Sequence, residues 1–200
     1  MKRLGILLSG RGSNFAAIAD NIAQGRLKNC EIAVVISNKA DAAGLKEAGK
    51  RGLKAIVIES NGRKRAEHDA DMIAALRQHQ VDLIILAGYM RLLSPEFIRA
   101  FPQRILNIHP SLLPAFPGLD AQEQAWLYGV QVAGCTVHFV DEELDHGVII
   151  LQKTVPVLES DDAHTLSQRI LEQEHIAYSE AIARVLSGEY RIEGRRYLRA

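Results

Sequence analysis

The first half of the chain alternates short, almost continuous apolar runs with longer amphipathic segments. Such runs are typical of strands buried on both faces, as in a parallel sheet. They predict strands at Leu4–Leu8, Ile32–Ile36, Ala55–Ile58 and Leu83–Ala87. Helices are predicted between them at Phe15–Gln24, Ala42–Arg51 and Lys64–Gln78. This alternation indicates an α/β fold with a doubly wound, mostly parallel sheet.

The second half of the chain predicts a mixed, β-rich part. Further strands are predicted at Ile105–Ile108, Gln131–Val140 and Val148–Val157. The last two could pair with each other or extend the sheet as a mixed sheet. Asp161–Ser187 has the pattern of a long amphipathic helix, with Ser160-Asp161-Asp162 as its cap. The tail Tyr190–Leu198, with Glu193-Gly194 inside it, resembles a hairpin.

Chain length and the shared fifth strand bear on the domain organisation. A chain of 200 residues suits one domain with a substantial core. The halves, about residues 1–100 and 101–200, share the fifth strand and its loops. We therefore expect a single domain over residues 1–200.

Charge and cysteine content indicate which classes of partner the protein binds and in which cellular compartment it lies. Basic and acidic residues both number 24, so the chain lacks the broad basic field of nucleic-acid or anionic-membrane binders. No stretch reaches the ~20 apolar residues of a membrane span. The two cysteines, Cys30 and Cys135, are far apart, which fits a reducing cytosol. We expect a soluble, cytoplasmic protein, and its neutral charge is compatible with discrete polyanion pockets.

A glycine-rich loop, Ser9-Gly10-Arg11-Gly12-Ser13-Asn14, follows the first strand and opens a helix. Glycines let the backbone approach an anion, and the helix N-terminus offers N–H groups and a favourable dipole. Phe15 stands where a dinucleotide fingerprint needs its third glycine, and the Gly-Lys-Ser/Thr of a P-loop is absent. The loop favours a ligand with a monophosphate. A structural turn without a ligand is the alternative.

Asn107 and His109 stand two positions apart in the fifth strand, just before Pro110. Side chains alternate along a strand, so both point to one face, with Cα atoms roughly 6.5 Å apart. Carboxyl ends of strands face the ligand crevice in open α/β sheets. An amide can donate to a developing oxyanion there, and an imidazole can donate or move protons. This suits acyl transfer, although His109 could instead be a structural histidine at a strand end.

The acidic loop Val137–Gly147 joins two of the predicted strands. Asp145 would orient His109 and favour its cationic form if the loop folded over the strand end. Asp141-Glu142-Glu143 suits a solvated turn. The seven histidines show no H-E-x-x-H or Cys/His spacing typical of zinc, so we expect no metal. A Ser-His-Asp hydrolase is not indicated, because G-x-S-x-G is absent.

Several motifs together resemble the formyltransferase family that uses 10-formyltetrahydrofolate. They are Asn107-Ile108-His109-Pro110-Ser111-Leu112-Leu113-Pro114, Phe116-Pro117-Gly118, Asp145-x-Gly147 and the Ser9–Asn14 loop. The resemblance runs through essentially the whole chain and is strongest to the branch that formylates glycinamide ribonucleotide in purine synthesis. It implies a Rossmann-like formyltransferase fold. Methionyl-tRNA formyltransferases carry a further C-terminal domain and formyltetrahydrofolate hydrolases a further N-terminal one, and we expect neither here.

The resemblance also implies roles for individual residues. Asn107, His109 and Asp145 match the family's catalytic trio. Residues that would bind the ribonucleotide are Gly12, Ser13, Asn14 and Glu174. Residues that would bind the folate are Arg65, Met90, Arg91, Leu92, Leu93, Asn107, Val140, Asp141 and Asp145. The residues 1–100 would form a nucleotide-binding half and 101–200 a folate and catalytic half.

The implied reaction is direct attack of the ribonucleotide amine on the formyl group of 10-formyltetrahydrofolate, the co-substrate. A formyltetrahydrofolate hydrolase and a non-catalytic binding regulator are the alternatives. The protein is expected to be a monomer or a homodimer. Many relatives carry His where Asp120 stands, and His146 occupies a variable position, so the sequence predicts no role for either residue.

Overall fold

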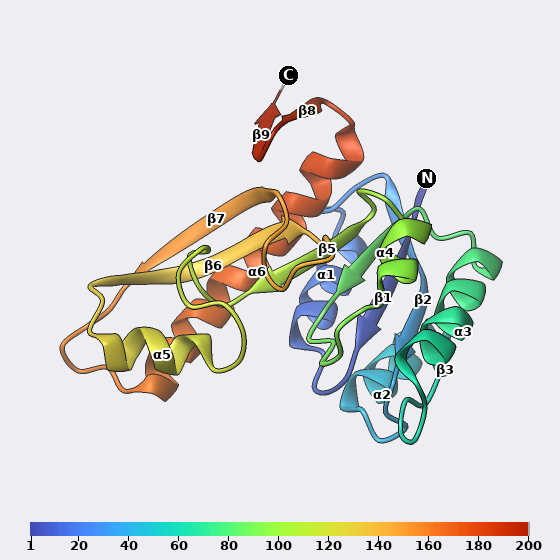
Figure 1. The fold of residues 1–200 in the computed structure, drawn as a ribbon, viewed down its shortest axis with the longest axis horizontal. Helices are drawn as coiled ribbons and strands as arrows, with labels where there is room; N and C mark the ends of the chain where they lie inside the picture. The colour runs from blue at the N-terminus through green and yellow to red at the C-terminus, as the bar shows by residue number, and fades with distance from the viewer. Residues whose placement is uncertain (200) are drawn as a thin grey trace. The chain divides into compact units, whose positions relative to one another are not determined.

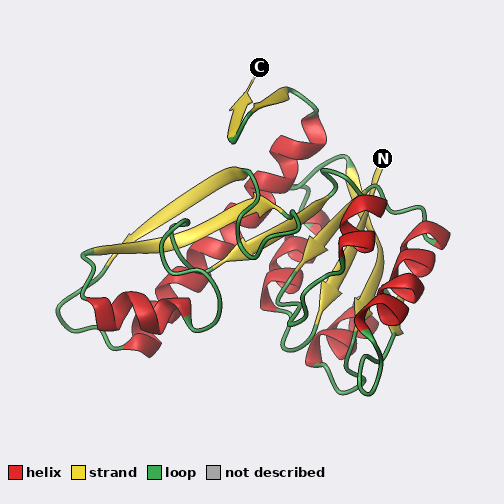
Figure 2. Ribbon diagram, viewed as in Figure 1, coloured by secondary structure: helices red, strands yellow, loops and turns green. Residues whose placement is uncertain are grey.

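The computed structural model describes residues 1–199 (Figure 1, Figure 2). Two compact units divide the chain: the first is Met1–Asn107 and the second begins at Ile108. Strand β5 (Ile105–His109) carries the chain from the first unit into the second. Among the described residues, no helix is both long enough and apolar enough to cross a membrane.

The first unit is a parallel sheet whose strands alternate with helices along the chain (Figure 2). Its strands run in the order β3-β2-β1-β4-β5, which is typical of a doubly wound sheet. Helix α1 packs beside α2, and α3 beside α4. The bounds are β1 (Lys2–Leu8), α1 (Ser13–Ala23), β2 (Cys30–Ser37), α2 (Ala43–Lys50), β3 (Ala55–Val57), α3 (Arg65–Gln78), β4 (Leu83–Leu86) and α4 (Pro95–Ala100).

Burial explains why the strands of the first unit can be recognised from apolarity alone. Leu4, Ile6, Leu7 and Leu8 of β1 are fully buried. Consecutive side chains point to opposite faces of a strand, so both faces of β1 are covered. A strand in this position must be apolar at nearly every residue, which is the pattern of the sequence.

The second unit is mostly antiparallel. Strand β6 (Val132–Phe139) pairs antiparallel with β7 (Ile149–Pro156), so these strands pair with each other. The hairpin β8 (Tyr190–Glu193) and β9 (Arg196–Arg199) follows, and β9 pairs parallel with β7. The long helix α6 (Ala163–Ser187) packs on β6 and β7 and beside α5 (Ala121–Tyr128). The α/β class with antiparallel strands near the C-terminus is confirmed.

Three differences from the predicted elements have local causes. Helix α6 begins at Ala163 because Asp162 is its N-cap, in a capping box with Thr165. Helices α4 and α5 are not predicted by the pattern. The first has only 6 residues, and the second exposes Leu127 and Tyr128, which obscures an amphipathic stripe.

Candidate active site

His109 ends strand β5 with both ring nitrogens facing oxygen acceptors. Its Nδ1 lies 3.3 Å from Oδ2 of Asp145, and its Nε2 donates to the Phe116 carbonyl at 2.8 Å. The two side chains are only 6% and 8% exposed. These contacts fix the orientation of the ring. An imidazolium, which carries an N–H on each nitrogen, satisfies both acceptors.

Asp145 is held by a hydrogen bond from the loop after β5. The backbone N–H of Gly118 donates to Asp145 Oδ2 at 2.8 Å. Asp145 has a φ of 51°, in the sparsely populated left-handed region, which Asp adopts more readily than most non-glycine residues. Phe116, whose carbonyl contacts His109, also has a φ of 51°, which is unusual for a bulky residue. Such conformations persist only where the surroundings determine them.

His138 lies beside this pair on β6. Its Nδ1 donates to the Phe139 carbonyl at 2.7 Å, and its Nε2 lies 3.9 Å from Asp145 Oδ1. Burial lowers the pKa of His138, although the charge of Asp145 acts in the opposite direction. His138 is not among the site residues predicted from the sequence. The available signal was its alternation with Thr136 along β6, which places both on one face of the strand.

Thr136 fixes the start of the loop that follows β5. Its hydroxyl donates to the Ser111 carbonyl at 2.7 Å and accepts the Leu113 N–H at 3.0 Å. Gln152, its register partner on β7, donates to both the Thr136 hydroxyl and the Leu113 carbonyl. Thr136 is fully buried. This network attaches the loop carrying Phe116 and Gly118 to the β6–β7 pair.

The glycine loop of the first unit leads into α1 through Gly12, whose φ is 74°. A Cβ on Gly12 would lie 3.1 Å from Cα of Gly44 at the start of α2, so the position favours glycine. The Gly44 N–H donates to the Gly10 carbonyl at 3.0 Å. The loop is thereby held at the N-terminus of α1, where backbone N–H groups and the helix dipole favour an anion.

The segment of residues 89–93 lies in the first unit after β4 and combines exposed apolar side chains with an arginine. Met90 is 68% and Leu92 52% exposed. The Met90 N–H donates to the buried hydroxyl of Ser9 at 2.8 Å, which ties the segment to the glycine loop. At the other end, Asp69 accepts the Ser94 N–H at 2.6 Å. The segment therefore offers apolar surface between two fixed ends.

The remaining predicted residues are placed individually. Arg65 begins α3 and is exposed, and Val140 and Asp141 follow β6 with half-exposed side chains. Glu174 is buried on α6.

Burial, aided by the charge of Glu174, raises the pKa of the Cys135 thiol to about 12, so Cys135 does not supply a thiolate nucleophile.

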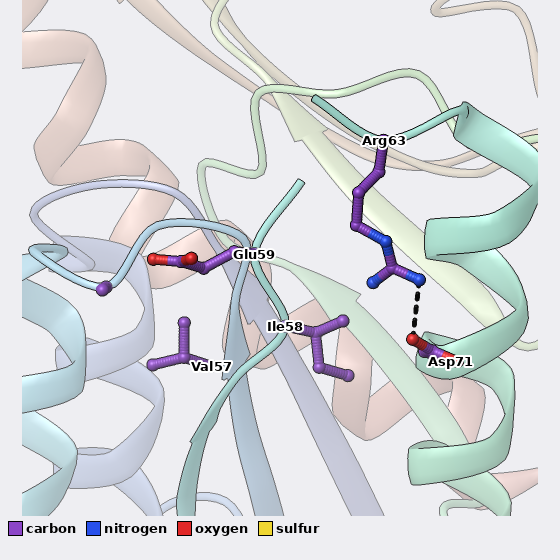
Figure 3. Close-up of a pocket in the computed structure, with 6 residues that line it drawn as sticks. Val57, Ile58, Glu59, Arg63 and Asp71 are labelled. Carbon is purple, nitrogen blue, oxygen red and sulfur yellow. Dashed lines mark hydrogen bonds and ion pairs between the residues drawn. The ribbon is translucent and has the colours of Figure 1, made fainter. Parts of the chain in front are cut away.

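A cavity of about 640 Å³ in the first unit contains none of the predicted site residues. Val57, Ile58 and Glu59, at the end of edge strand β3, line it (Figure 3). Arg63 points to Asp71 and forms an ion pair with it at 2.8 Å. Among residues 1–199, no three His, Cys, Asp or Glu side chains gather to hold a metal ion.

Comparison with known sequences identifies the family. The formyl transferase family matches residues 2–182. A trifunctional purine biosynthetic protein adenosine-3 from Drosophila pseudoobscura pseudoobscura is 47% identical over 194 residues, which cover 95% of this chain and 14% of that protein. A phosphoribosylglycinamide formyltransferase from Bacillus subtilis is 41% identical over 187 residues, which cover 93% and 95% of the two chains. The chain thus spans a small part of the trifunctional protein and nearly all of the bacterial one.

Solved structures share the fold throughout. A glycinamide ribonucleotide transformylase 1 from Symbiobacterium toebii is 51% identical with a TM-score of 0.96, over 100% of this chain and 94% of that one. A formyltetrahydrofolate deformylase from Pseudomonas syringae pv. tomato is 27% identical with a TM-score of 0.92, over 99% of this chain and 65% of that one. The fold is thus common to proteins named for formyl transfer and for deformylation.

Proposed function

This chain belongs to the formyl transferase family, and we propose that it is a phosphoribosylglycinamide formyltransferase. It transfers the formyl group of 10-formyltetrahydrofolate to the amine of glycinamide ribonucleotide, in purine biosynthesis. The observation that carries this proposal is the buried His109–Asp145 pair at the end of β5, in a chain whose similarity covers full-length transformylases.

The proposed chemistry begins when the ribonucleotide amine attacks the formyl carbon. A tetrahedral intermediate forms, with negative charge on the former formyl oxygen. Asn107 donates its amide N–H to this oxyanion, and the imidazolium of His109 stabilises it. The His109 Nε2–H now bound to the Phe116 carbonyl is the donor that would turn to the oxyanion, so this hydrogen bond must exchange during the reaction.

Asp145 supports the positive charge of His109 and holds a water that relays protons. The attacking amine loses a proton, and the folate nitrogen gains one as its bond to the formyl carbon breaks. The products are the formylated ribonucleotide and tetrahydrofolate. No step needs a covalent enzyme intermediate, which agrees with the raised pKa of the buried Cys135 thiol.

Ribonucleotide binding is assigned to the glycine loop and to Glu174. The N-terminus of α1, at Gly12, Ser13 and Asn14, suits the phosphate because its N–H groups and dipole favour an anion. The Glu174 carboxylate would accept hydrogen bonds from the ribose hydroxyls. The charge of a carboxylate strengthens such bonds relative to neutral ones.

Folate binding is assigned to residues 89–93, to Arg65 and to the acidic loop. The exposed side chains of Met90 and Leu92 offer the apolar surface that a flat pterin ring requires. Leu93 and Val140 are assigned to the same ligand, and Arg65 and Arg91 would pair with the carboxylates of the folate tail. Asp141 and Asp145 contribute from the acidic loop.

Absorbance-monitored consumption of 10-formyltetrahydrofolate tests the proposal. The purified protein is incubated with the folate alone and then with added glycinamide ribonucleotide. We expect consumption to require the ribonucleotide. Equal consumption without it would show that water is the acceptor.

A hydrolase is the second candidate, because the deformylase from Pseudomonas syringae shares this fold. Two features favour transfer: the nearly full-length match to named transformylases and the phosphate-compatible loop before α1. A regulator that binds both ligands without chemistry would bind them tightly and consume neither. The same incubation, followed by binding measurements, distinguishes all three functions.

A further inference from the structure

The C-terminal hairpin, β8 and β9, lies beyond residues 2–182, which the formyl transferase family matches. The proposed reaction assigns it no role. Its turn contains Gly194, with a φ of 59°, and Arg195. The hairpin packs at the part of the acidic loop that follows β6, residues 140–147, which carries Asp145.

Arg195 of the hairpin turn contacts both the ring and the carbonyl of His146 in the acidic loop. Its Nη1 lies 2.8 Å from His146 Nε2, and its Nη2 donates to the His146 carbonyl. The same Nη1 lies 3.3 Å from His146 Nδ1, and this Nδ1 lies 2.8 Å from Asp141 Oδ2. The other oxygen of Asp141 accepts the Glu143 N–H at 3.0 Å. The ring of His146 thus contacts both Arg195 of the hairpin and Asp141 of the acidic loop.

A second set of contacts joins the hairpin to the base of the loop. Tyr190 stacks on Tyr197 within the hairpin, with ring centroids 4.8 Å apart. The ring of Tyr190 also lies 6.1 Å from that of Phe139, where β6 ends. Across the base, a Cβ on Gly147 would lie 1.7 Å from the Phe139 carbonyl, so the two ends of the loop touch. The hairpin therefore contacts the loop at its base and at His146.

Asp145 stands next to His146 and has a φ of 51°, in the sparsely populated left-handed region. Its carboxylate must stay within reach of His109 Nδ1, 3.3 Å away. A loop with a residue in this region needs external support to keep one conformation. The contacts of Arg195 and Tyr190 are such support, and they come from a segment that follows α6.

We propose that the C-terminal hairpin braces the acidic loop, with Arg195 and His146 as positioning residues that keep Asp145 at His109 and shape the folate side of the site. The functional part of this inference rests on the proposed function. The brace itself is a property of the loop and is independent of the reaction. Arg195 acts through His146 and touches no reacting atom.

Hydrogen exchange of the whole protein, followed by steady-state kinetics, tests the brace. In Arg195→Ala, amides of residues 141–147 should exchange about three- to tenfold faster than in the wild type, the range expected for one net hydrogen bond. Exchange of β1 should not change. The KM for 10-formyltetrahydrofolate should rise by a similar factor, and the KM for the ribonucleotide should stay the same.

Arg191→Ala is the matched control, because Arg191 is exposed on the same hairpin and pairs with Glu193 rather than with the loop. Arg195→Lys keeps the charge but cannot donate from two nitrogens of one plane, so it should resemble Arg195→Ala. Unchanged exchange at 141–147 in Arg195→Ala would overturn the brace. So would an equal acceleration in Arg191→Ala. If exchange at residues 141–147 were faster in Arg195→Ala than in the wild type, but the wild type transferred no formyl group, the proposed function would be refuted and the brace would stand.

Discussion

Oδ2 of Asp145 lies 3.3 Å from Nδ1 of His109, and the same oxygen accepts the N–H of Gly118. The carboxylate therefore joins two loops and the end of β5 at one atom. Asp145 therefore orients the imidazole of His109 and also holds the loop that contains Gly118. Substitutions that remove one of these two effects and keep the other are the most informative.

Replacing Asp145 by Asn should reduce kcat by about 100- to 1000-fold, the usual cost of losing one stabilising group of a developing oxyanion. Asn tolerates the left-handed conformation and keeps an oxygen for Gly118, so folding should be nearly unaffected. Glu143→Gln, an exposed change in the same loop, is the control. Steady-state kinetics and urea unfolding measure the two quantities. A kcat within tenfold of the wild type would remove Asp145 from the catalytic groups.

Thr136→Val should lower both stability and kcat. The substitution keeps the shape but leaves the Leu113 N–H without its hydroxyl acceptor, at a cost of about 1–3 kcal/mol in the free energy of unfolding. A less ordered loop after β5 would move Phe116 and Gly118 away from their positions beside His109 and Asp145. Thr154→Val, on the exposed face of β7, should change neither quantity. If Thr136→Val lost stability and kept full kcat, the loop would not depend on this network for its active position.

Burial of His138 makes stability depend on pH. Its pKa in the folded protein is below the ordinary 6.5, so the unfolded chain binds the proton more readily. The contribution to stability is therefore complete above pH 6.5 and declines as the pH falls from 6.5 toward the lower folded pKa. Urea unfolding across this range should show a smaller decline in His138→Asn than in the wild type. An identical decline in both would contradict the assignment, and the exposed His164→Asn is the control.

Glu174→Ala should weaken ribonucleotide binding, because charge-assisted hydrogen bonds to the ribose would be lost. The KM for glycinamide ribonucleotide should rise by about tenfold or more. The KM for 10-formyltetrahydrofolate should remain near the wild-type value. An effect confined to the folate would contradict the assignment of Glu174. Titration of the ribonucleotide by calorimetry gives the binding change independently of turnover.

The strands and the Asn107–His109 spacing could be predicted from the sequence because they depend on local periodicity. A strand covered on both faces must be apolar throughout, and β1 meets that condition. Two polar residues two positions apart at the end of such a strand are conspicuous for the same reason.

The placement of Asp145 could not be predicted from periodicity. It depends on loops in which Phe116, Gly118 and Asp145 all have positive φ values, and periodicity carries no information about such turns. Asp145 was expected only through resemblance to a family. Contacts between exposed residues distant in sequence, such as Arg195 with His146, have no sequence signal at all. Helix α5 was missed because its apolar residues Leu127 and Tyr128 face solvent.

The fate of the formyl group tests the central claim most directly. The wild-type protein is given 10-formyltetrahydrofolate and glycinamide ribonucleotide, and formylated ribonucleotide, tetrahydrofolate and free formate are quantified by mass spectrometry and enzymatic assay. The account predicts one formylated ribonucleotide for each tetrahydrofolate formed, with no formate above the background of a His109→Ala variant. Tetrahydrofolate that appears together with an equal amount of formate, and without formylated ribonucleotide, would contradict it.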